Sequence, residues 1–542
     1  MTTTTFGDPR LLFWSAAGPH EQRRREALRR LLAIRGEAGF PEVVRLCTTR
    51  FGGPPDESER PATGAPESHT GGAGERQTGG ALERQTAGAP EPRTRGAGER
   101  PVTSVTEPPA RGAGGSPGEE VRGAVVAAGA AEAMALLDGH RAASPPRRPV
   151  ALLIPGQGAQ YRAMATGLYG HEPGFTDALD AAFAALGDRG RRLRAEWLAA
   201  DPDVPWDDGS RAQPLLFAVG YALGAMVVSW GVRPAAVLGH SVGELVSAVL
   251  AGIFSLADAA RLMGDRIDAV AATPAGGMLA VAAPAARLAP YVEGAGGDVA
   301  VAAVNAPRQT LLAGPERSLS IVEARLRADG FTVRRAKARQ AFHSPVMRAA
   351  GAATAGTVRA AAPRAPSWSF YSGYAGGPLA AETARDPGFW ANQLTDPVLF
   401  WPALDALLAS GPHLLVEAGP GQGLTAIARA HPAVRSRHSD VVPLLPARHS
   451  GPAADRRAVC AAAARLWLEG HPLRWPTGGP ASGRPDTPAS GRPASGRPAS
   501  GRPDTPASGS PGMPASGRPD IAASGPADDA AREEAFRATQ RV

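Results

Sequence analysis

A serine stands between two glycines in the stretch GHSVG, residues 239–243. Gly-x-Ser-x-Gly at a turn from a strand into a helix forms a nucleophile elbow, where small neighbours leave the serine oxygen exposed. The backbone N–H of Val242 then begins the helix and can face a developing oxyanion. The pattern predicts attack by Ser241 on a carbonyl carbon. The same pattern also arises by chance in a chain with 66 glycines.

The segments on either side of this motif help to decide between the two interpretations. Residues 235–240, AAVLGH, have the apolar character of a strand, and residues 244–252, ELVSAVLAG, have helical spacing. The strand-to-helix context that the elbow requires is therefore met, which favours a nucleophilic serine.

A serine nucleophile needs a general base to take its proton. The chain has 11 histidines. His240 adjoins the serine but would point elsewhere on the turn, so His343, in QAFHSPVM, is the predicted base. Taken without the serine, His343 is more often an ordinary core or surface histidine.

The elements that must position these residues form an α/β pattern. From 149 to about 450, short apolar strands such as PVALLIPG and HLLVEAGP alternate with longer helical stretches. Within it, residues 277–336 read as strands with one or two helices, which indicates a small inserted α+β subdomain. Strand and helix patterns in 1–51 and 121–148 predict a further small unit before the α/β domain.

Two tracts lack the residues needed for a core. Residues 52–120 and 476–542 are repetitive, rich in Gly, Pro and Ser, and almost free of large apolar side chains. Such segments cannot bury enough apolar surface to offset their chain entropy. We therefore expect a disordered insert and a disordered tail.

Composition excludes several classes of function. The net charge is +7, but no stripe of basic and aromatic residues of the nucleic-acid-binding kind is present. Cys47 and Cys460 are too few and too distant for a disulfide framework or a zinc site, which favours a reducing cytoplasm. Residues 214–232 are uncharged and apolar, but their glycines and the strand pattern that follows favour a buried helix over a membrane span.

Several motifs, in order, resemble those of malonyl-CoA:acyl carrier protein transacylases, and most of all the acyltransferase domains of modular polyketide synthases. They are PGQGAQ (155–160), GHSVGE (239–244), Arg266, AFHSP (341–345), FWANQLTDPVLF (389–400) and VEAGPGQGLT (416–425). The resemblance covers about 149–475. It extends to 9–51 and 121–145, which are similar to the linker domain before such acyltransferases, while 451–475 is similar to the segment that wraps around after them.

The resemblance implies a fold and a set of catalytic roles. The fold is an α/β-hydrolase-like large subdomain with an inserted ferredoxin-like small subdomain, preceded by the linker domain. Ser241 would attack a malonyl thioester, and His343 would take its proton. Family members have no triad carboxylate, and a backbone carbonyl, here that of Gln393, orients the histidine. The backbone N–H groups of Gln157 and Val242 would form the oxyanion hole.

The resemblance also implies residues that bind the acyl group. Arg266 would hold the free carboxylate of malonyl, for which a guanidinium offers a bidentate contact. Without the resemblance, Arg266 reads as a solvated helix arginine. Gln213, Asn305, Phe342 and His240 match positions lining the substrate pocket, although Gln213 and Asn305 also fit local cap or turn positions.

The choice of extender acid is encoded at two places in such domains. Malonyl-selecting members resemble GHSVGE and HAFH, whereas methylmalonyl-selecting members have glutamine after the serine and YASH. Val242 and Phe342 fit the malonyl pattern, and Phe342 would fill the space that an α-methyl group needs. Gln340 departs from it, because the pattern has histidine there.

The expected function is transfer of malonyl from malonyl-CoA, through an acyl-serine, to the phosphopantetheine thiol of an acyl carrier protein in polyketide or fatty acid biosynthesis. The chain reads as a free-standing cytoplasmic enzyme, or as one domain separated from an assembly line. We expect no bound cofactor or metal. The expected partners are the acyl carrier protein and polyketide synthase modules, with neither nucleic acid nor a membrane.

Other functions remain open at this point. A thioesterase-like editing enzyme would use the same Ser241 and His343 but pass the acyl group to water, although editing relatives typically lose the arginine found at 266. Another starter or extender acyl-CoA could be the substrate. A scaffold that recruits a synthase would have no reason to keep Gln157, Ser241, Arg266 and His343 together.

Overall fold

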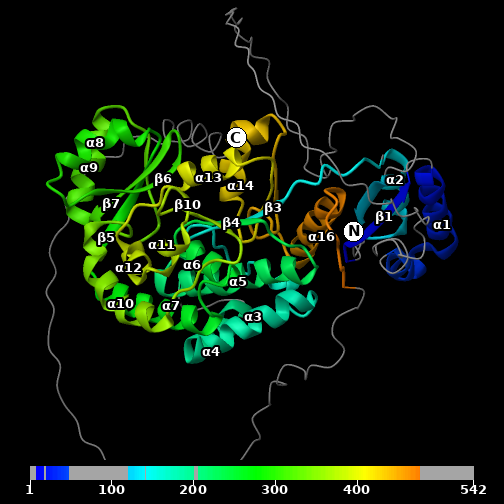
Figure 1. Ribbon diagram of the computed structural model, residues 1–542, viewed down its shortest axis with the longest axis horizontal. Helices are drawn as coiled ribbons and strands as arrows, with labels where there is room; N and C mark the ends of the chain where they lie inside the picture. The colour runs from blue at the N-terminus through cyan, green and yellow to red at the C-terminus, as the bar shows by residue number, and fades with distance from the viewer. Residues whose placement is uncertain (1–7, 18–19, 48–119, 141, 200–204, 477–542) are drawn as a thin grey trace, which may run out of the picture.

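The computed structural model describes a three-part molecule: a small N-terminal unit, a large α/β domain and an inserted small subdomain (Figure 1). The described residues are 8–17, 20–47, 120–140, 142–199 and 205–476. The predicted disordered insert and tail lie outside these residues, apart from Glu120 and Pro476.

The N-terminal unit consists of β1 (Arg10–Ala17), α1 (Glu21–Leu46), β2 (Glu120–Ala127) and α2 (Ala130–Gly139). The two strands pair antiparallel over their whole length, from Arg10 opposite Ala127 to Ala17 opposite Glu120. Alternate side chains therefore face opposite sides of the ribbon. Leu12 and Trp14 pack against α1 and α2, whereas Leu11 and Phe13 belong to the core of the large domain.

The large domain is built on a six-stranded sheet in the order β10-β9-β4-β3-β11-β12. All neighbours pair in parallel except β10, an antiparallel edge strand. The strands are β3 (Val150–Ile154), β4 (Ala236–Gly239), β9 (Ser369–Ser372), β10 (Gly377–Pro378), β11 (Leu414–Glu417) and β12 (Asp440–Pro443). The central strands are buried on both faces, which explains their continuous apolar sequences.

Helices cover both faces of this sheet (Figure 1). Leu152 points into a core with the helices on one face, and the next residue, Leu153, points into a core with α13 and α14 on the other. The helices of the domain are α3 (Pro173–Ala185), α4 (Gly187–Leu198), α5 (Gly209–Ser229), α6 (Val242–Leu250), α7 (Leu256–Ala271), α10 (Arg348–Ala361), α11 (Ala381–Arg385), α12 (Pro387–Ala391), α13 (Phe400–Ala409), α14 (Gly423–Ala430), α15 (Pro432–Arg435) and α16 (Pro452–Leu468).

The helix α5 is long and apolar enough to cross a membrane by length and composition. Of its most apolar window, 72% is buried inside the molecule, where it packs with α3 and α6. The structure thus places this segment as a core helix, as the sequence predicted.

The small subdomain lies between α7 and α10 in the chain. It contains β5 (Gly276–Val281), α8 (Ala285–Glu293), β6 (Ala300–Ala306), β7 (Gln309–Pro315), α9 (Glu316–Ala328) and β8 (Val333–Arg335). Its antiparallel sheet has the order β6-β7-β5-β8. The amide of Val304 donates to the carbonyl of Val398 at 2.8 Å, which joins β6 to the large domain.

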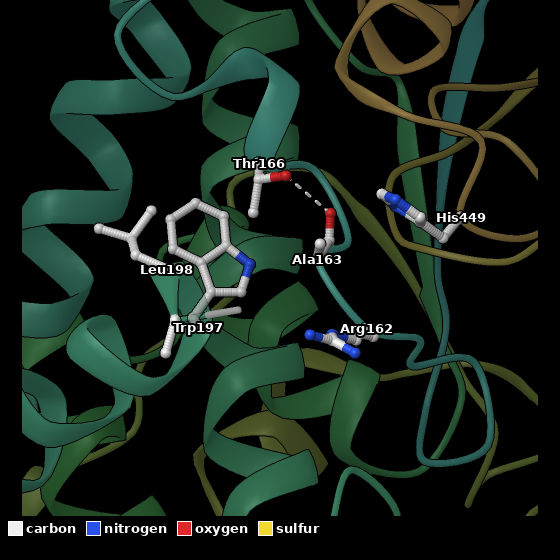
Figure 2. Close-up of a pocket in the computed structure, with 7 residues that line it drawn as sticks. Arg162, Ala163, Thr166, Trp197, Leu198 and His449 are labelled. Atoms are coloured by element: carbon white, nitrogen blue, oxygen red, sulfur yellow. Dashed lines mark hydrogen bonds between the residues drawn. The ribbon is translucent and has the colours of Figure 1, made fainter. Parts of the chain in front are cut away.

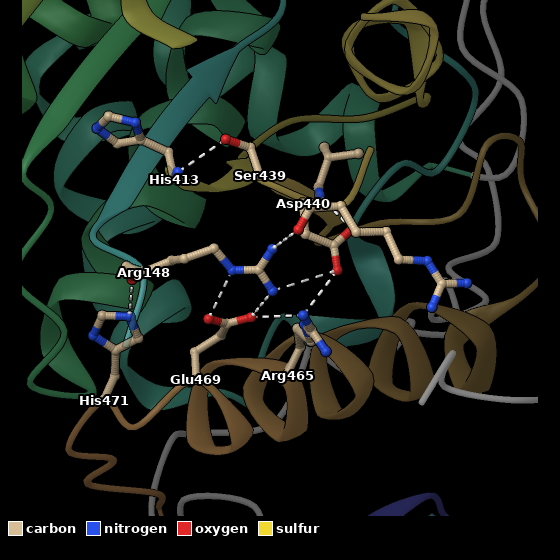
Figure 3. A network of polar contacts seen from close by, with 9 residues as sticks. Arg148, His413, Ser439, Asp440, Arg465, Glu469 and His471 are labelled. Carbon is tan, nitrogen blue, oxygen red and sulfur yellow. Dashed lines mark hydrogen bonds and ion pairs between the residues drawn. The ribbon is translucent and has the colours of Figure 1, made fainter. Parts of the chain in front are cut away.

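The helix α16 connects the large domain to the N-terminal unit. On one side, the indole of Trp467 donates to the carbonyl of Trp14 at 3.1 Å, and its ring packs on Phe13. On the other side lies a network of buried charges (Figure 3). Glu469, just past the helix end, receives hydrogen bonds from Arg148 at 2.5 and 3.1 Å and from Arg465 at 2.6 Å.

Candidate active site

The serine of the GHSVG motif sits on a strained turn between β4 and α6. Ser241 has φ 54° and ψ −119°, a conformation that costs a non-glycine residue roughly 1–3 kcal/mol. A side chain at Gly239 would collide with the backbone of Glu244, and one at Gly243 would collide with the carbonyl of Ile154. Both glycines are therefore needed for the turn to pack against β3.

The loop that follows β3 lies directly against this turn. A Cβ atom at Gly156 would lie 2.5 Å from the carbonyl oxygen of His240 and 3.2 Å from the Cβ of Ser241. The close approach brings the backbone of Gln157 beside the serine. Val242 is the first residue of α6, so its N–H has no acceptor within the helix. The two predicted oxyanion donors thus come from segments that meet at Ser241.

The predicted base contacts the serine directly. The Oγ of Ser241 lies 2.8 Å from Nε2 of His343. The other ring nitrogen, Nδ1, lies 3.1 Å from the carbonyl oxygens of both Gln393 and Asp396. Carbonyls only accept, so we assign the proton to Nδ1, which leaves the lone pair of Nε2 facing the serine. Gln393 was predicted from the sequence, and Asp396 was not.

Burial sets the protonation state of this histidine. Together with smaller contributions from the neighbouring His240 and Arg266, burial lowers the pKa of His343 to about 4. The two carbonyls act in the opposite direction and are outweighed. His343 is therefore neutral at pH 7 and can accept the proton of Ser241.

Arg266, on α7, is a buried cation near the dyad. Its guanidinium donates to the carbonyl of Trp390 at 2.8 Å and to Oε1 of Gln393 at 3.2 Å, and its Nε has no hydrogen-bond partner among the described residues. No carboxylate of the described residues forms an ion pair with it. Gln393 therefore contacts Arg266 with its side chain and His343 with its backbone.

Glu244, in the first turn of α6, is an acidic side chain that interacts electrostatically with this cation. Burial raises the pKa of Glu244 to about 8, despite hydrogen bonds from the Ser372 hydroxyl at 2.5 Å and the Gly373 amide at 2.8 Å. The carboxyl is therefore mainly protonated at pH 7 and leaves the charge of Arg266 uncompensated. Glu244 lies within the quoted motif, but its contacts, 128 residues away at Ser372, have no signal in the sequence.

The remaining predicted pocket residues also gather around the dyad. Nε2 of His240 lies 2.8 Å from Oδ1 of Asn305, which places the small subdomain beside the elbow. The side chain of Gln213 donates to Oε1 of Gln157 at 2.9 Å. Phe342 is buried next to His343. The structure thus brings together every predicted site residue.

A separate hollow of about 410 Å³ opens elsewhere on the large domain (Figure 2). It is lined by Arg162, Ala163, Thr166, Trp197, Leu198, Ala199 and His449. None of these lining residues is a member of the Ser–His dyad, and none takes part in the hydrogen bonds given above for the dyad. The chemistry predicted from the sequence therefore does not belong to this hollow.

Comparison with known proteins identifies the family of this fold and site. A family described as "Acyl transferase domain" matches residues 152–458, more than half of the chain. One subunit of the phenolphthiocerol/phthiocerol polyketide synthase of Mycobacterium tuberculosis is 35% identical over 347 residues, which cover 63% of this chain and 23% of that protein. The chain thus spans about a quarter of the length of this relative.

Solved structures agree with this match. The acyltransferase domain from the second module of the salinomycin polyketide synthase is 32% identical, with a TM-score of 0.58 over 64% of this chain and 82% of that domain. The acyltransferase domain of SpnD, in complex with 2-(pent-4-yn-1-yl)malonyl, is 26% identical, with a TM-score of 0.63 over 86% of this chain and 97% of that domain. The chain belongs to the acyl transferase domain family, and it is similar to the acyltransferase domains of modular polyketide synthases.

Proposed function

We propose that this protein transfers a malonyl group from malonyl-CoA to the phosphopantetheine thiol of an acyl carrier protein, through an ester on Ser241. The observation that carries the proposal is a neutral Ser–His dyad, with Oγ and Nε2 2.8 Å apart, close to a buried arginine that has no carboxylate partner among the described residues. A thioester that also carries a free carboxylate would fit both the dyad, at its thioester carbon, and the arginine, at its carboxylate.

In the first half-reaction, Oγ of Ser241 attacks the thioester carbon while Nε2 of His343 takes the hydroxyl proton. The negative charge on the carbonyl oxygen is stabilised by the N–H groups of Gln157 and Val242. One such donor contributes about 2.7–4 kcal/mol in hydrolytic enzymes. The carbon–sulfur bond then breaks, the proton passes from His343 to the departing thiolate, and malonyl remains on Ser241 as an ester.

The second half-reaction reverses these steps with another thiol. His343 deprotonates the phosphopantetheine thiol, its sulfur attacks the ester carbon, and the carbon–oxygen bond to Ser241 breaks. The proton returns from His343 to the serine oxygen. Atoms and charges balance without a cofactor or a metal ion, so we propose that the enzyme uses neither.

Arg266 provides selectivity for a dicarboxylic acyl group. A buried cation without a counter-ion is costly, and a substrate carboxylate would compensate its charge. The relative SpnD was solved with a substituted malonyl, which supports a malonyl-type substrate. Phe342, buried beside His343, supports an unsubstituted malonyl over methylmalonyl.

The architecture supports the finer assignments made from the sequence. The βαββαβ order of the small subdomain supports a ferredoxin-like unit, and the parallel sheet with its elbow supports an α/β-hydrolase-like large subdomain. We propose that 1–51 and 121–148 form a linker domain, 149–450 the acyltransferase domain and 451–475 a wrapping segment. We further propose a cytoplasmic enzyme that works with carrier proteins of polyketide synthase modules.

The test is intact-protein mass spectrometry after incubation with malonyl-CoA, with and without a holo carrier protein. We expect a malonyl adduct on the wild-type chain, none on Ser241→Ala, and transfer to the carrier when it is added. Rapid release of free malonate without the carrier would support the editing hydrolase instead. An adduct with acetyl-CoA but none with malonyl-CoA would contradict the proposal. Full biological activity of Ser241→Ala would favour a scaffold.

A further inference from the structure

We propose that Tyr374 determines which acyl groups the site accepts, because its hydroxyl lies among the nucleophile Ser241, the cation Arg266 and the carboxyl of Glu244. This inference rests on the proposed acyl transfer. It assigns a role to a residue that none of the sequence motifs contains.

The contacts of Tyr374 place it at the reacting atoms. Its hydroxyl forms a side-chain hydrogen bond with Ser241 and interacts electrostatically with Arg266 and Glu244. Its ring centroid lies 5.9 Å from that of His343 and 6.5 Å from that of Phe389, which it meets edge-on at 90°. The tyrosine thus touches both members of the dyad and faces the cation.

The backbone of this tyrosine is fixed by the helix that follows the nucleophile. Tyr374 lies in the short connection between β9 and β10. Its amide donates to Oγ of Ser372 at 3.0 Å, and that hydroxyl in turn donates to Glu244. The amide of Gly373 donates to the same carboxyl. Because Glu244 is three residues after Ser241, the tyrosine is held at a set distance from the serine oxygen.

The hydroxyl of Tyr374 is a neutral donor. Burial raises its pKa above the ordinary value, and the neighbouring carboxyl of Glu244 acts in the same direction. Because Ser241 donates to His343 before attack, the tyrosine hydroxyl donates to the serine oxygen in the free enzyme. Once that oxygen becomes an ester, the hydroxyl is free to donate to the acyl group.

A malonyl ester on Ser241 must run from the serine oxygen toward Arg266. Its C2 atom lies between the ester carbon and the free carboxylate, which is the space that the Tyr374 side chain borders. The hydroxyl therefore donates to the malonyl carboxylate together with Arg266, and the ring limits the size of a C2 substituent. The preferred substrate class is a thioester of malonate without a branch at C2.

The two functions of the side chain separate in two variants. Tyr374→Phe keeps the ring and removes the donor. A hydrogen bond to a charged group contributes about 1.5–3 kcal/mol, so we expect the malonyl-to-acetyl ratio of acylation rates to fall at least about tenfold. Tyr374→Ala removes the wall, and we expect the methylmalonyl-to-malonyl and ethylmalonyl-to-malonyl ratios to rise about 10–200-fold.

The experiment measures acylation of the full chain by rapid quench and intact-mass analysis with malonyl-, methylmalonyl-, ethylmalonyl- and acetyl-CoA. Tyr371→Phe is the matched control, since it removes a hydroxyl three residues away on β9, and it should leave all ratios unchanged. Thermal unfolding of each variant checks the fold. If Tyr374→Ala fails to fold, Tyr374→Phe decides, because its expected effect is confined to the carboxylated substrates.

The outcomes distinguish this inference from the proposed function. If the wild-type chain takes no malonyl-type acyl group, the proposed function fails. If the wild-type chain is acylated by malonyl-CoA and the ratios for both variants equal those of Tyr371→Phe, the role of Tyr374 is overturned and the proposed function stands. An equal loss of malonyl and acetyl transfer in Tyr374→Phe would also overturn it.

Discussion

Among the regions of this molecule that bury arginine side chains, the end of α16 and the active site treat the charge in opposite ways. At the end of α16, Arg148 and Arg465 both contact the carboxylate of Glu469, and Arg465 also lies 2.8 Å from Asp440 (Figure 3). In the active site, Arg266 contacts only a carbonyl and an amide oxygen by hydrogen bonds within the described part of the chain. The first arrangement is complete, and the second leaves a positive charge without an ionic partner.

The difference separates a charge that joins elements from a charge that binds a ligand. Removing ions from water costs several kcal/mol, and close, hydrogen-bonded partners offset that cost. Glu469 offsets it for Arg148, just before β3, and for Arg465 on α16. Beside Arg266, burial raises the pKa of the Glu244 carboxyl to about 8, so in the proposed mechanism the substrate carboxylate supplies the missing negative charge. A buried arginine without a carboxylate is thus the stronger indicator of function.

The largest effect is expected for Arg266→Met. Truncating one partner of a buried charge pair costs about 2–5 kcal/mol, so kcat/KM with malonyl-CoA should fall about 10³-fold. Acetyl-CoA has no carboxylate to lose, and its acylation rate should not fall. The free energy of unfolding should change by less than about 1.5 kcal/mol, because no protein ion pair is lost. A parallel fall for both thioesters would contradict ligand binding by Arg266.

The opposite result is expected for Glu469→Gln. Two guanidiniums lose their shared counter-charge, and urea unfolding should show a loss of about 3 kcal/mol. The malonyl-to-acetyl ratio should stay at the wild-type value. Asp268→Asn, which removes an exposed ion pair with Arg189, is the control and should change stability by less than about 1 kcal/mol. Equal stabilities for the two variants would remove the contrast between the regions.

A third test lowers the pH until His343 is protonated, which places a second positive charge near Arg266. Since the pKa of His343 is lowered to about 4, acylation should be constant between about pH 5 and pH 8 and fall tenfold per unit below about pH 4. The same shift predicts the sign of the effect on stability. The unfolded histidine, with a pKa of 6.5, binds its proton first, so this residue lowers stability as the pH falls from 6.5 to 4. An activity midpoint near 6.5 would contradict a buried neutral base.

The smallest effect is expected from the ionisation of Glu244. Its carboxylate would then form an ion pair with Arg266. Above about pH 8, the carboxylate of Glu244 should compete for Arg266 and lower the affinity for malonyl-CoA several-fold. Glu244→Gln should abolish this alkaline decline, because the amide cannot ionise, while its oxygen can still accept the hydrogen bond from the amide of Gly373. Because the folded pKa lies above the usual 4.5, ionisation also lowers stability between pH 4.5 and 8. An identical alkaline profile for Glu244→Gln would refute this role.

Most residues that touch substrate in the proposed mechanism could be named from the sequence, because they lie in short motifs that occur in a fixed order along the chain. The elbow at Ser241 is local, so a five-residue pattern determines it. His343, Arg266 and Gln393 were found through motifs in a fixed order, and the structure brings them together. The apolar core strands of the large domain were likewise readable, since strands buried on both faces are apolar at every position.

Other features could not be read, because they depend on contacts between distant segments. The carbonyl of Asp396 lies near His343 through the shape of the turn that follows η6 (Asn392–Leu394), and a backbone carbonyl leaves no residue-type signal. Tyr374 reaches the site because Ser372 is anchored to Glu244, 128 residues away. The lack of a carboxylate partner for Arg266 among the described residues could not be predicted either, because a sequence pattern does not show which side chains fail to pack beside one another.

The position of α16 has a consequence for the order in which the nascent chain folds. Trp467 supports Trp14 and Phe13 although 453 positions separate it from Trp14. At roughly 5–20 residues per second, the ribosome needs roughly 20–90 s to synthesise that interval. Throughout it, the face of β1 that α16 covers has no permanent partner. An early strand is thus completed by a late helix, and premature termination before residue 467 would release a chain with an apolar ribbon exposed near its beginning.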